Sequence, residues 1–176
     1  MASTPEPSAW RIDSAGRAAQ SFSGVGASLE GGRWNSAGVR AVYASEHLAM
    51  AAQERYVHMP KPLPGGLRFV KFPIRFGRVA VRRIRPRDLP GDWRAEPVPA
   101  STQALGDAWI ASGETAVLAV PSVLIPEETN FVLNPAHPDF RVLAVGAPEP
   151  FEFDPRMARL EEPGPGRRAA PPGGRR

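Results

Sequence analysis

Short stretches of β-branched and aromatic residues recur along the chain and predict strands. The segment VRAVYA at 39–44 follows Gly38 and has the Val, Tyr and Ala composition of a strand that packs on one face. An uninterrupted apolar run, AVLAV at 116–120, is typical of a central strand covered on both faces. Further strand patterns lie at 67–74, 78–84, 131–133 and 140–145.

Two segments show the helical period instead. Ser45 and Glu46 offer an N-cap and a first-turn acid for a helix that we expect to run to about Tyr56 and to end before the prolines at 60, 62 and 64. Its expected buried face is made by Leu48, Ala51, Ala52 and Tyr56. Ser101 or Thr102 would cap a second helix that Gly113 closes, with Leu105, Trp109 and Ile110 facing inward. Many strands with two helices predict an α+β fold, a mixed and mostly antiparallel sheet with packed helices.

The composition favours one domain between two unstructured ends. The segment 161–176 consists of Pro, Gly, Arg, Glu and Ala, and it cannot bury enough apolar surface to offset the ordering of its backbone. We therefore expect a disordered tail at 161–176, a flexible N-terminus at 1–9 and a single domain at 10–160.

Several classes of function are disfavoured. The chain has no cysteine, which excludes a disulfide scaffold, a thiolate nucleophile and cysteine-ligated zinc. Its 3 histidines are scattered, so no metal site is expected. No apolar stretch approaches the ~20 residues of a membrane-spanning helix, and we expect a soluble, cytoplasmic protein with no membrane partner. The net charge of +4 is weak support for nucleic-acid binding.

The strongest chemical pattern is an arginine, a tyrosine and a glutamate at intervals of ten and eleven residues: Arg33, Tyr43 and Glu54. Arg33 follows Gly31 and Gly32, which let a backbone approach an anion, and its guanidinium could hold a pyrophosphate in a bidentate fork. The alternative is a turn made by the two glycines with a solvated arginine.

Tyr43 and Glu54 also have two interpretations each. Tyr43 ends a strand, where its ring could stack on a nucleotide base, or it is a core tyrosine. Glu54 could hold a ribose hydroxyl and stabilise the positive charge that develops when a glycosidic bond breaks, or it is a solvated helix acid. Trp34 is expected in the core.

Three other side chains are candidate ligands. Arg11, between Trp10 and Ile12, is either a second phosphate ligand or a strand-edge arginine. Ser122 follows an apolar strand, and its hydroxyl would lie at the strand end. Asn130 could bind substrate or, like Asn134, organise a turn.

The ordered series of these motifs resembles the RES domain, the toxin half of RES-Xre toxin-antitoxin modules, from Trp10 to about Phe153. The matching motifs are WRI at 10–12, GGRWNSAG at 31–38, VYAS at 42–45, Glu54, LP at 89–90 with Trp93, TQ at 102–103, GDAW at 106–109, VPS at 120–122, Asn130 and NP at 134–135.

The resemblance implies an ADP-ribosyltransferase-like fold that acts on NAD as its substrate, with no other cofactor. It implies Glu54, Arg33 and Tyr43 as catalytic residues, with Arg11, Ser122 and Asn130 completing the substrate site. An Xre-like antitoxin would cover the site and supply DNA binding, so that the chain itself would make no direct contact with nucleic acid.

The predicted function is depletion of NAD by cleavage of the nicotinamide-ribose bond. Water or inorganic phosphate would be the nucleophile. The alternative is mono-ADP-ribosylation of a host protein. A different class, a basic RNA-binding or RNA-cleaving toxin, is suggested by a pI of about 10.3 and by the arginines at 82, 83, 85 and 87, but no RNA-binding motif or catalytic histidine pair accompanies them.

Overall fold

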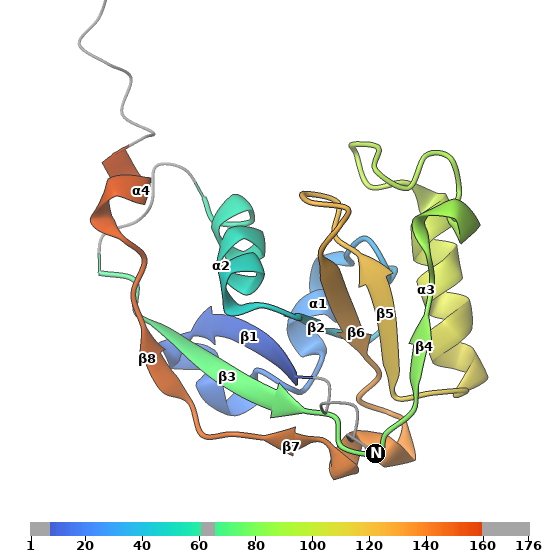
Figure 1. The fold of residues 1–176 in the computed structure, drawn as a ribbon, viewed down its shortest axis with the longest axis horizontal. Helices are drawn as coiled ribbons and strands as arrows, with labels where there is room; N and C mark the ends of the chain where they lie inside the picture. The colour runs from blue at the N-terminus through green and yellow to red at the C-terminus, as the bar shows by residue number, and fades with distance from the viewer. Residues whose placement is uncertain (1–7, 61–65, 160–176) are drawn as a thin grey trace, which may run out of the picture.

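β1 (Ser8–Ser14) runs between β2 and β3 in a strongly curled sheet that organises the whole chain (Figure 1). The computed structural model describes residues 8–60 and 66–159. The strand order is β4-β5-β6-β2-β1-β3-β7, with β8 pairing β3. β4 and β5 are parallel, and every other pair of strands is antiparallel. The predicted α+β class with a mixed, mostly antiparallel sheet is therefore confirmed.

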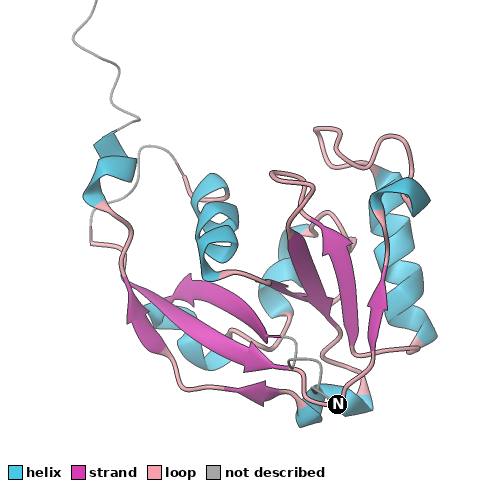
Figure 2. Cartoon of the chain, viewed as in Figure 1, coloured by secondary structure: helices cyan, strands magenta, loops and turns pink. Residues whose placement is uncertain are grey.

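The remaining strands are β2 (Val42–Ser45), β3 (Phe69–Arg75), β4 (Val81–Arg83), β5 (Val117–Pro121), β6 (Thr129–Leu133), β7 (Ala144–Val145) and β8 (Glu149–Phe151). The helices are α1 (Val25–Glu30), α2 (Leu48–Val57), α3 (Ala100–Ser112) and α4 (Pro155–Arg159). Three 3₁₀ helices, η1 (Ala15–Gln20), η2 (Pro86–Asp88) and η3 (Pro138–Val142), lie in the connections. Figure 2 shows α2 and α3 standing on either side of β5 and β6.

The core consists of three hydrophobic clusters. One surrounds Phe76 and Phe131, whose rings meet edge to face at 4.8 Å between centroids. A second lies beneath α3 and contains Trp34, which is 3% exposed, as predicted for a core residue. The third joins α2 to β1 and β3 through Ile12, Ala51, Met59 and Phe69. α2 is thus fixed on the sheet through one face, which leaves another face for the site.

α3 lies in the connection between the parallel strands β4 and β5. The parallel pair β4 and β5 cannot be joined by a hairpin, and α3 supplies the crossover between them. The predicted closure by Gly113 is confirmed, since this residue has φ 59° and its N–H bonds the carbonyl of Ile110. The predicted cap at Ser101 or Thr102 is wrong. The cap is Pro99; the hydroxyl of Ser101 donates to Asp92 and that of Thr102 to the carbonyl of Pro99.

Three other local expectations are corrected. Ser45 is not the N-cap of α2, because it belongs to β2 opposite Asn130; His47 is the cap. The strand expected at 39–44 begins at Val42. Most of the strand expected at 140–145 is instead the 3₁₀ helix η3, which Pro138 opens, and only Ala144–Val145 pairs as β7.

The sequence did not indicate α1, β8 or α4. The tail expected at 161–176, residues 1–7 and the prolines at 62 and 64 lie outside the described residues. None of the helices in the described ranges has the length and apolar character needed to cross a membrane.

Candidate active site

The carboxylate of Glu54 joins three elements of the fold. Its Oε1 accepts a hydrogen bond of 2.9 Å from Ser122 Oγ and one of 2.6 Å from Asn130 Nδ2. Glu54 lies on α2, Ser122 directly follows β5, and Asn130 lies in β6. Three of the residues that the sequence singled out, separated by up to 76 positions, are therefore in direct contact.

The two donors are themselves oriented. Ser45 Oγ donates to Asn130 Oδ1 at 2.7 Å, so the amide of Asn130 must turn its Nδ2 toward Glu54. The hydroxyl oxygen of Ser122 accepts from the backbone N–H groups of Leu124 and Ile125, at 3.1 and 3.3 Å, and so aims its hydrogen at Glu54. The two hydrogen bonds to Oε1 therefore hold the Glu54 carboxylate in one orientation.

The second carboxylate oxygen of Glu54 has a much weaker contact. Oε2 lies 3.9 Å from Nε2 of His58, one helical turn farther along α2, and the imidazole is 77% exposed. The Glu54 side chain is 24% exposed. One oxygen is thus fixed to the protein, while the other remains available to a hydrogen-bond donor of a bound molecule.

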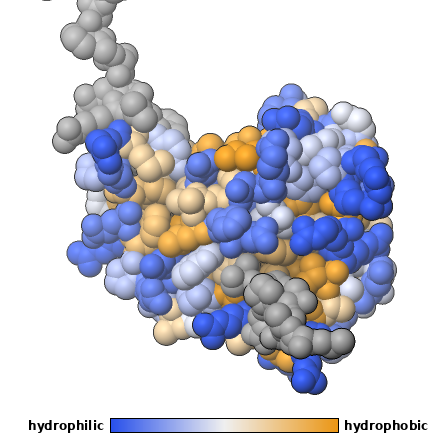
Figure 3. All heavy atoms as spheres, viewed as in Figure 1, coloured by the Kyte–Doolittle hydropathy of each residue, from blue (hydrophilic) through white to orange (hydrophobic). Residues whose placement is uncertain are grey.

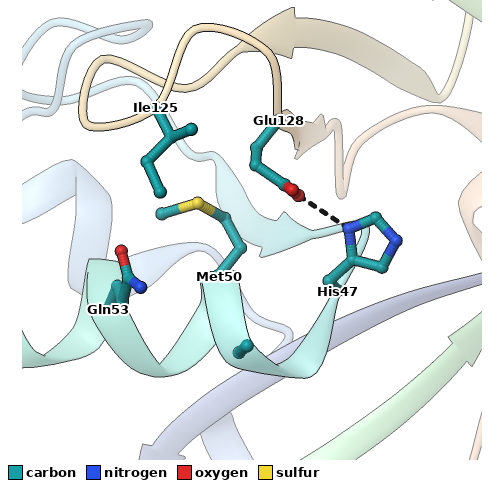
Figure 4. Close-up of a pocket in the computed structure, with 6 residues that line it drawn as sticks. His47, Met50, Gln53, Ile125 and Glu128 are labelled. Atoms are coloured by element: carbon teal, nitrogen blue, oxygen red, sulfur yellow. Dashed lines mark hydrogen bonds and ion pairs between the residues drawn. The ribbon is translucent and has the colours of Figure 1, made fainter.

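A pocket of about 340 Å³ opens between α2 and the loop that joins β5 to β6 (Figure 4). Met50 and Ile125 face each other across it, and His47 and Glu128 close one end. His47 Nδ1 and Glu128 Oε2 are 2.6 Å apart, and this hydrogen bond raises the pKa of His47. Because Ile125 is tied to Ser122, one wall of the pocket is coupled to the oriented Glu54.

Arg33 is held by a different part of the chain. Its guanidinium donates to the carbonyls of Trp93 and Ala95, at 2.8 and 3.1 Å, and to Glu96 Oε1 at 2.5 Å. The Arg33 side chain is 10% exposed, whereas that of Glu96 is 72% exposed. The alternative of a solvated arginine is therefore wrong. Arg33 instead joins the segment 93–96 to its own loop, the connection between α1 and β2, which we call the Arg33 loop.

The hydroxyl of Tyr43 is engaged by that same loop. It donates to Asn35 Oδ1 at 2.6 Å and accepts from the Trp34 N–H at 3.1 Å. Burial raises the pKa of Tyr43. A Cβ on Gly32 would lie 2.6 Å from this hydroxyl, so glycine is required there for close approach. Tyr43 thus fixes the backbone conformation on which the position of Arg33 depends.

α3 holds the same loop from its other side. Gln103 Nε2 donates to the carbonyl of Gly32 at 3.1 Å, and Asp107 Oδ1 accepts from the Ser36 N–H at 2.9 Å. A Cβ on Gly106 would lie 1.9 Å from the carbonyl oxygen of Trp34, so the helix and the loop are in backbone contact. The motif GDAW at 106–109 therefore serves the position of the Arg33 loop.

Arg11 connects β1 to β2. Its Nη1 donates to the carbonyl of Tyr43 at 2.8 Å, and its Nη2 donates to Asp13 Oδ2 at the same distance. Burial is the main cause that lowers the pKa of Arg11, with the nearby Asp13 opposing it. Arg11 is thus neither a free strand-edge arginine nor an isolated ligand.

The candidate residues form two connected groups. Glu54, Ser122 and Asn130 meet side chain to side chain, while Arg33, Tyr43 and Arg11 are linked through the Arg33 loop and β2.

Sequence reasoning missed the positioning roles of Ser45, Asp13 and Glu96. Asp13 could have been noticed, because it lies two residues after Arg11 and shares its side of the strand. Asn134 organises a turn as expected, accepting from the Ala136 N–H. Within 8–60 and 66–159 no group of three or more His, Cys, Asp or Glu side chains could hold a metal ion.

Comparison with known proteins agrees with this architecture. The chain is 40% identical over 154 residues to a "Prs ADP-ribosylating toxin" of Sphingobium sp. (strain YBL2), covering 85% of this chain and 96% of the relative. It is 36% identical over 140 residues to a "Toxin Res" of Yersinia enterocolitica, covering 79% and 91%.

A chain in the crystal structure of the M. tuberculosis MbcT-MbcA toxin-antitoxin complex has the same fold. The TM-score is 0.67 at 19% identity, and the match covers 89% of this chain and 88% of that one. The RES domain matches residues 8–154, nearly the whole described region. The protein therefore belongs to the RES domain family.

Proposed function

We propose that this protein is the toxin of a toxin-antitoxin module and that it acts on NAD by breaking the bond between nicotinamide and ribose. The family and the two relatives named as toxins support the first part. The observation that carries the second is the carboxylate of Glu54, which two donors hold through Oε1 while Oε2 is left for a ligand.

This arrangement suits a reaction in which positive charge develops on a sugar. As nicotinamide leaves, the ribose acquires oxocarbenium character, and a fixed carboxylate stabilises that charge without having to reorient. In this proposal Oε2 of Glu54 accepts a hydrogen bond from a ribose hydroxyl. Ser122, which is fully buried, and Asn130 act through Glu54, whose carboxylate they hold in place.

The remaining candidates bind the rest of the dinucleotide. Arg33 and Arg11 provide guanidinium groups for the pyrophosphate, and Tyr43 supports the base from the Arg33 loop. Since Arg33 now holds Glu96, pyrophosphate binding to Arg33 requires exchange of that carboxylate for phosphate oxygens.

A second candidate function is transfer of ADP-ribose to a protein. It is favoured by the relative that is 40% identical and is named an ADP-ribosylating toxin. The pocket beside Glu54 is bordered by the β5–β6 loop, in which Leu124 and Ile125 are 38% and 36% exposed. A protein that accepts ADP-ribose could bind against these two side chains. Figure 3 shows hydrophobic surface at the top of the molecule, where this loop lies.

The same surface suits the partner that the family resemblance implies. We propose that an Xre-like antitoxin covers the mouth of the site, with the exposed apolar side chains of the β5–β6 loop in its interface. The complex that contains the structural neighbour supports a protein partner for this fold.

An RNA-directed activity is less well supported. Arg82 pairs with Glu114, and Arg85 and Arg87 both pair with Asp88, so acids within the chain offset much of this charge. A phosphate-binding surface that depends on counterion release would need these cations to be available.

The decisive experiment is incubation of the purified full chain with NAD, with and without inorganic phosphate, followed by mass spectrometry of products and protein. Free nicotinamide together with ADP-ribose would indicate hydrolysis. Free nicotinamide with a phosphorylated ADP-ribose would indicate phosphorolysis. A mass gain on added host proteins would indicate transfer. Glu54→Gln serves as the inactive control. Intact NAD in every condition, with a correctly folded protein, would rule out the proposed chemistry.

A further inference from the structure

Four side chains follow one another along one side of α2. They are spaced by three, four and four positions, which is the spacing of neighbours on a helix surface, and they are His47, Met50, Glu54 and His58. His47 and Met50 line the pocket, and His58 is the C-cap residue of the helix. Glu54 therefore has an imidazole on either side of it along the same stripe.

The chain's 3 histidines differ in how they are engaged. His47 lies 2.6 Å from a carboxylate oxygen of Glu128, which raises the pKa of His47 and makes it a poorer proton acceptor. Nδ1 of His137 accepts from a backbone N–H of η3 at 3.0 Å. Nε2 of His58 lies 3.9 Å from Oε2 of Glu54, too far for a hydrogen bond, and the imidazole is 77% exposed. His58 thus faces the oxygen of Glu54 that we assign to the ribose, and it is open to solvent.

The separation of these two atoms matches a bridging group. A water molecule or a hydroxyl group can lie about 2.8 Å from both Nε2 and Oε2 when they are 3.9 Å apart. A nucleophile that bonds Nε2 of His58 would then be next to the ribose that Oε2 of Glu54 holds.

The cleavage of NAD by a neutral nucleophile requires such a second group. Glu54 has to remain negatively charged while it stabilises the positive ribose, so it cannot take up the proton of the nucleophile at the same time. Imidazole is the side chain most often used as a base near neutral pH. In the tautomer with its proton on Nδ1, His58 presents the lone pair of Nε2 toward Glu54.

We propose that His58 is a further catalytic residue, the base that accepts the proton of the nucleophile when NAD is cleaved. The bond between ribose C1′ and the nicotinamide nitrogen breaks, and its electron pair leaves with neutral nicotinamide. An oxygen of the nucleophile bonds C1′, and its proton moves to Nε2 of His58, from which it passes to solvent. This inference rests on the proposed function and adds to it the class of nucleophile.

That class follows from the proton balance. Water, or a hydroxyl group of a protein, must lose a proton when its oxygen bonds C1′, whereas inorganic phosphate attacks through an oxygen that is already deprotonated. A base beside Glu54 therefore assists hydrolysis or transfer and has no proton to accept in phosphorolysis. His58 thus favours a neutral nucleophile that bears a proton.

Initial rates of NAD cleavage by the purified full chain, with products identified by mass spectrometry, test the role of His58. His58→Gln keeps a polar side chain that cannot accept a proton. We expect kcat to fall about 100-fold or more with KM nearly unchanged, the usual contribution of a general base. His137→Asn is the matched control, because asparagine can still accept the backbone N–H that opens η3, near β7 and away from α2 (Figure 1). It should react like the wild type.

Chemical rescue separates proton transfer from a structural role. His58→Gly leaves space where the imidazole was, and its position at the end of α2 does not interrupt the helix. Added imidazoles should restore turnover in this variant, and the more basic ones should restore more of it at equal concentrations of free base. Glu54→Gln should not respond to them.

The outcomes separate this inference from the proposed function. Turnover close to that of the wild type in a folded His58→Gln protein, or a loss in His58→Gly that no imidazole restores, would overturn the role of His58. A wild type that yields only phosphorylated ADP-ribose would also overturn it, although the proposed bond cleavage would then stand. Intact NAD with the wild type would overturn the proposed function, and this inference with it.

Discussion

Asn130 Nδ2 donates to Glu54 Oε1 over 2.6 Å and so ties the beginning of β6 to α2. The amide is oriented because Ser45 Oγ donates to Asn130 Oδ1, which leaves Nδ2 to face Glu54. Anything that removes the donor at position 130 should therefore disturb the carboxylate first and the fold second.

Asn130→Asp is expected to abolish most activity. The substitution places a second carboxylate against Glu54 at hydrogen-bonding distance, and two like charges there repel each other. We expect NAD consumption to fall by about 100-fold or more, the loss typical when an oriented electrostatic group is removed. Initial rates measured by nicotinamide release would check this, with circular dichroism to verify folding. Wild-type rates in a folded variant would mean that the orientation of Glu54 has no bearing on turnover.

Glu54→Gln removes the negative charge at position 54 while keeping the size and shape of the side chain. The amide oxygen of glutamine can still accept from Ser122 and Asn130, so the thermal stability should change little. Loss of the negative charge opposite a developing oxocarbenium should lower turnover by about 10² to 10³. Glu114→Gln is the matched control, since it neutralises an exposed acid that pairs with Arg82 instead. Similar rates for the two variants would remove Glu54 from the chemistry.

Glu96→Gln tests whether Arg33 must release its carboxylate partner before it binds substrate. If Glu96 competes with the pyrophosphate, its neutralisation should lower KM for NAD by up to about fivefold, because an exposed ion pair is worth at most about 1 kcal/mol. The kcat should stay near the wild-type value. Steady-state kinetics at several NAD concentrations would show this. A higher KM would indicate that Glu96 positions Arg33 for binding and does not compete.

Tyr43→Phe should destabilise the Arg33 loop. Without the hydroxyl, the N–H of Trp34 loses its acceptor and Oδ1 of the buried Asn35 loses a donor. We expect the free energy of unfolding to fall by about 1 to 3 kcal/mol, measured by urea denaturation. An unchanged unfolding midpoint would contradict the role assigned to this hydroxyl.

His47 should titrate above the ordinary histidine pKa of 6.5, because Glu128 stabilises its protonated form. The ion pair at this end of the pocket should then be fully formed below pH 6.5 and be lost as the pH rises through the raised pKa of His47 in the folded protein. Proton NMR of the imidazole ring would follow this. In Glu128→Gln the midpoint should move back toward 6.5, and an unmoved midpoint would point to another cause.

Local patterns in the sequence identified the core elements well. The apolar run at 116–120 could be little other than a central strand, and β5 is buried along its length. Glu54 could be singled out as an acid on a helix otherwise rich in alanine, and Ser122 because it follows an apolar strand. Their meeting could not be inferred, since 68 positions separate them and only the strand order brings them together.

The errors had a physical origin as well. A serine ahead of a helix looks the same whether its hydroxyl caps the helix or bonds a neighbouring strand, so the role of Ser45 depends on Asn130, 85 positions away. The partners of Arg33 are likewise at least 60 positions distant. The segment 140–145 is apolar enough for a strand, but the turn that begins at Pro138 continues as η3 and uses most of its length.

The junction between β1 and β2 is the shortest strand pairing in the described part of the sheet. Within the described residues these strands meet at one residue pair, Trp10 opposite Ser45, whereas β1 and β3 pair along their whole length. The described sheet therefore divides at this pair into β4-β5-β6-β2 and β1-β3-β7 with β8, and the side chain of Arg11 joins the two parts by donating to the carbonyl of Tyr43. Because so little backbone pairing joins them, the orientation of one part against the other depends on side chains, namely this arginine and the hydrophobic cluster that contains Ala9, Val42 and Phe131.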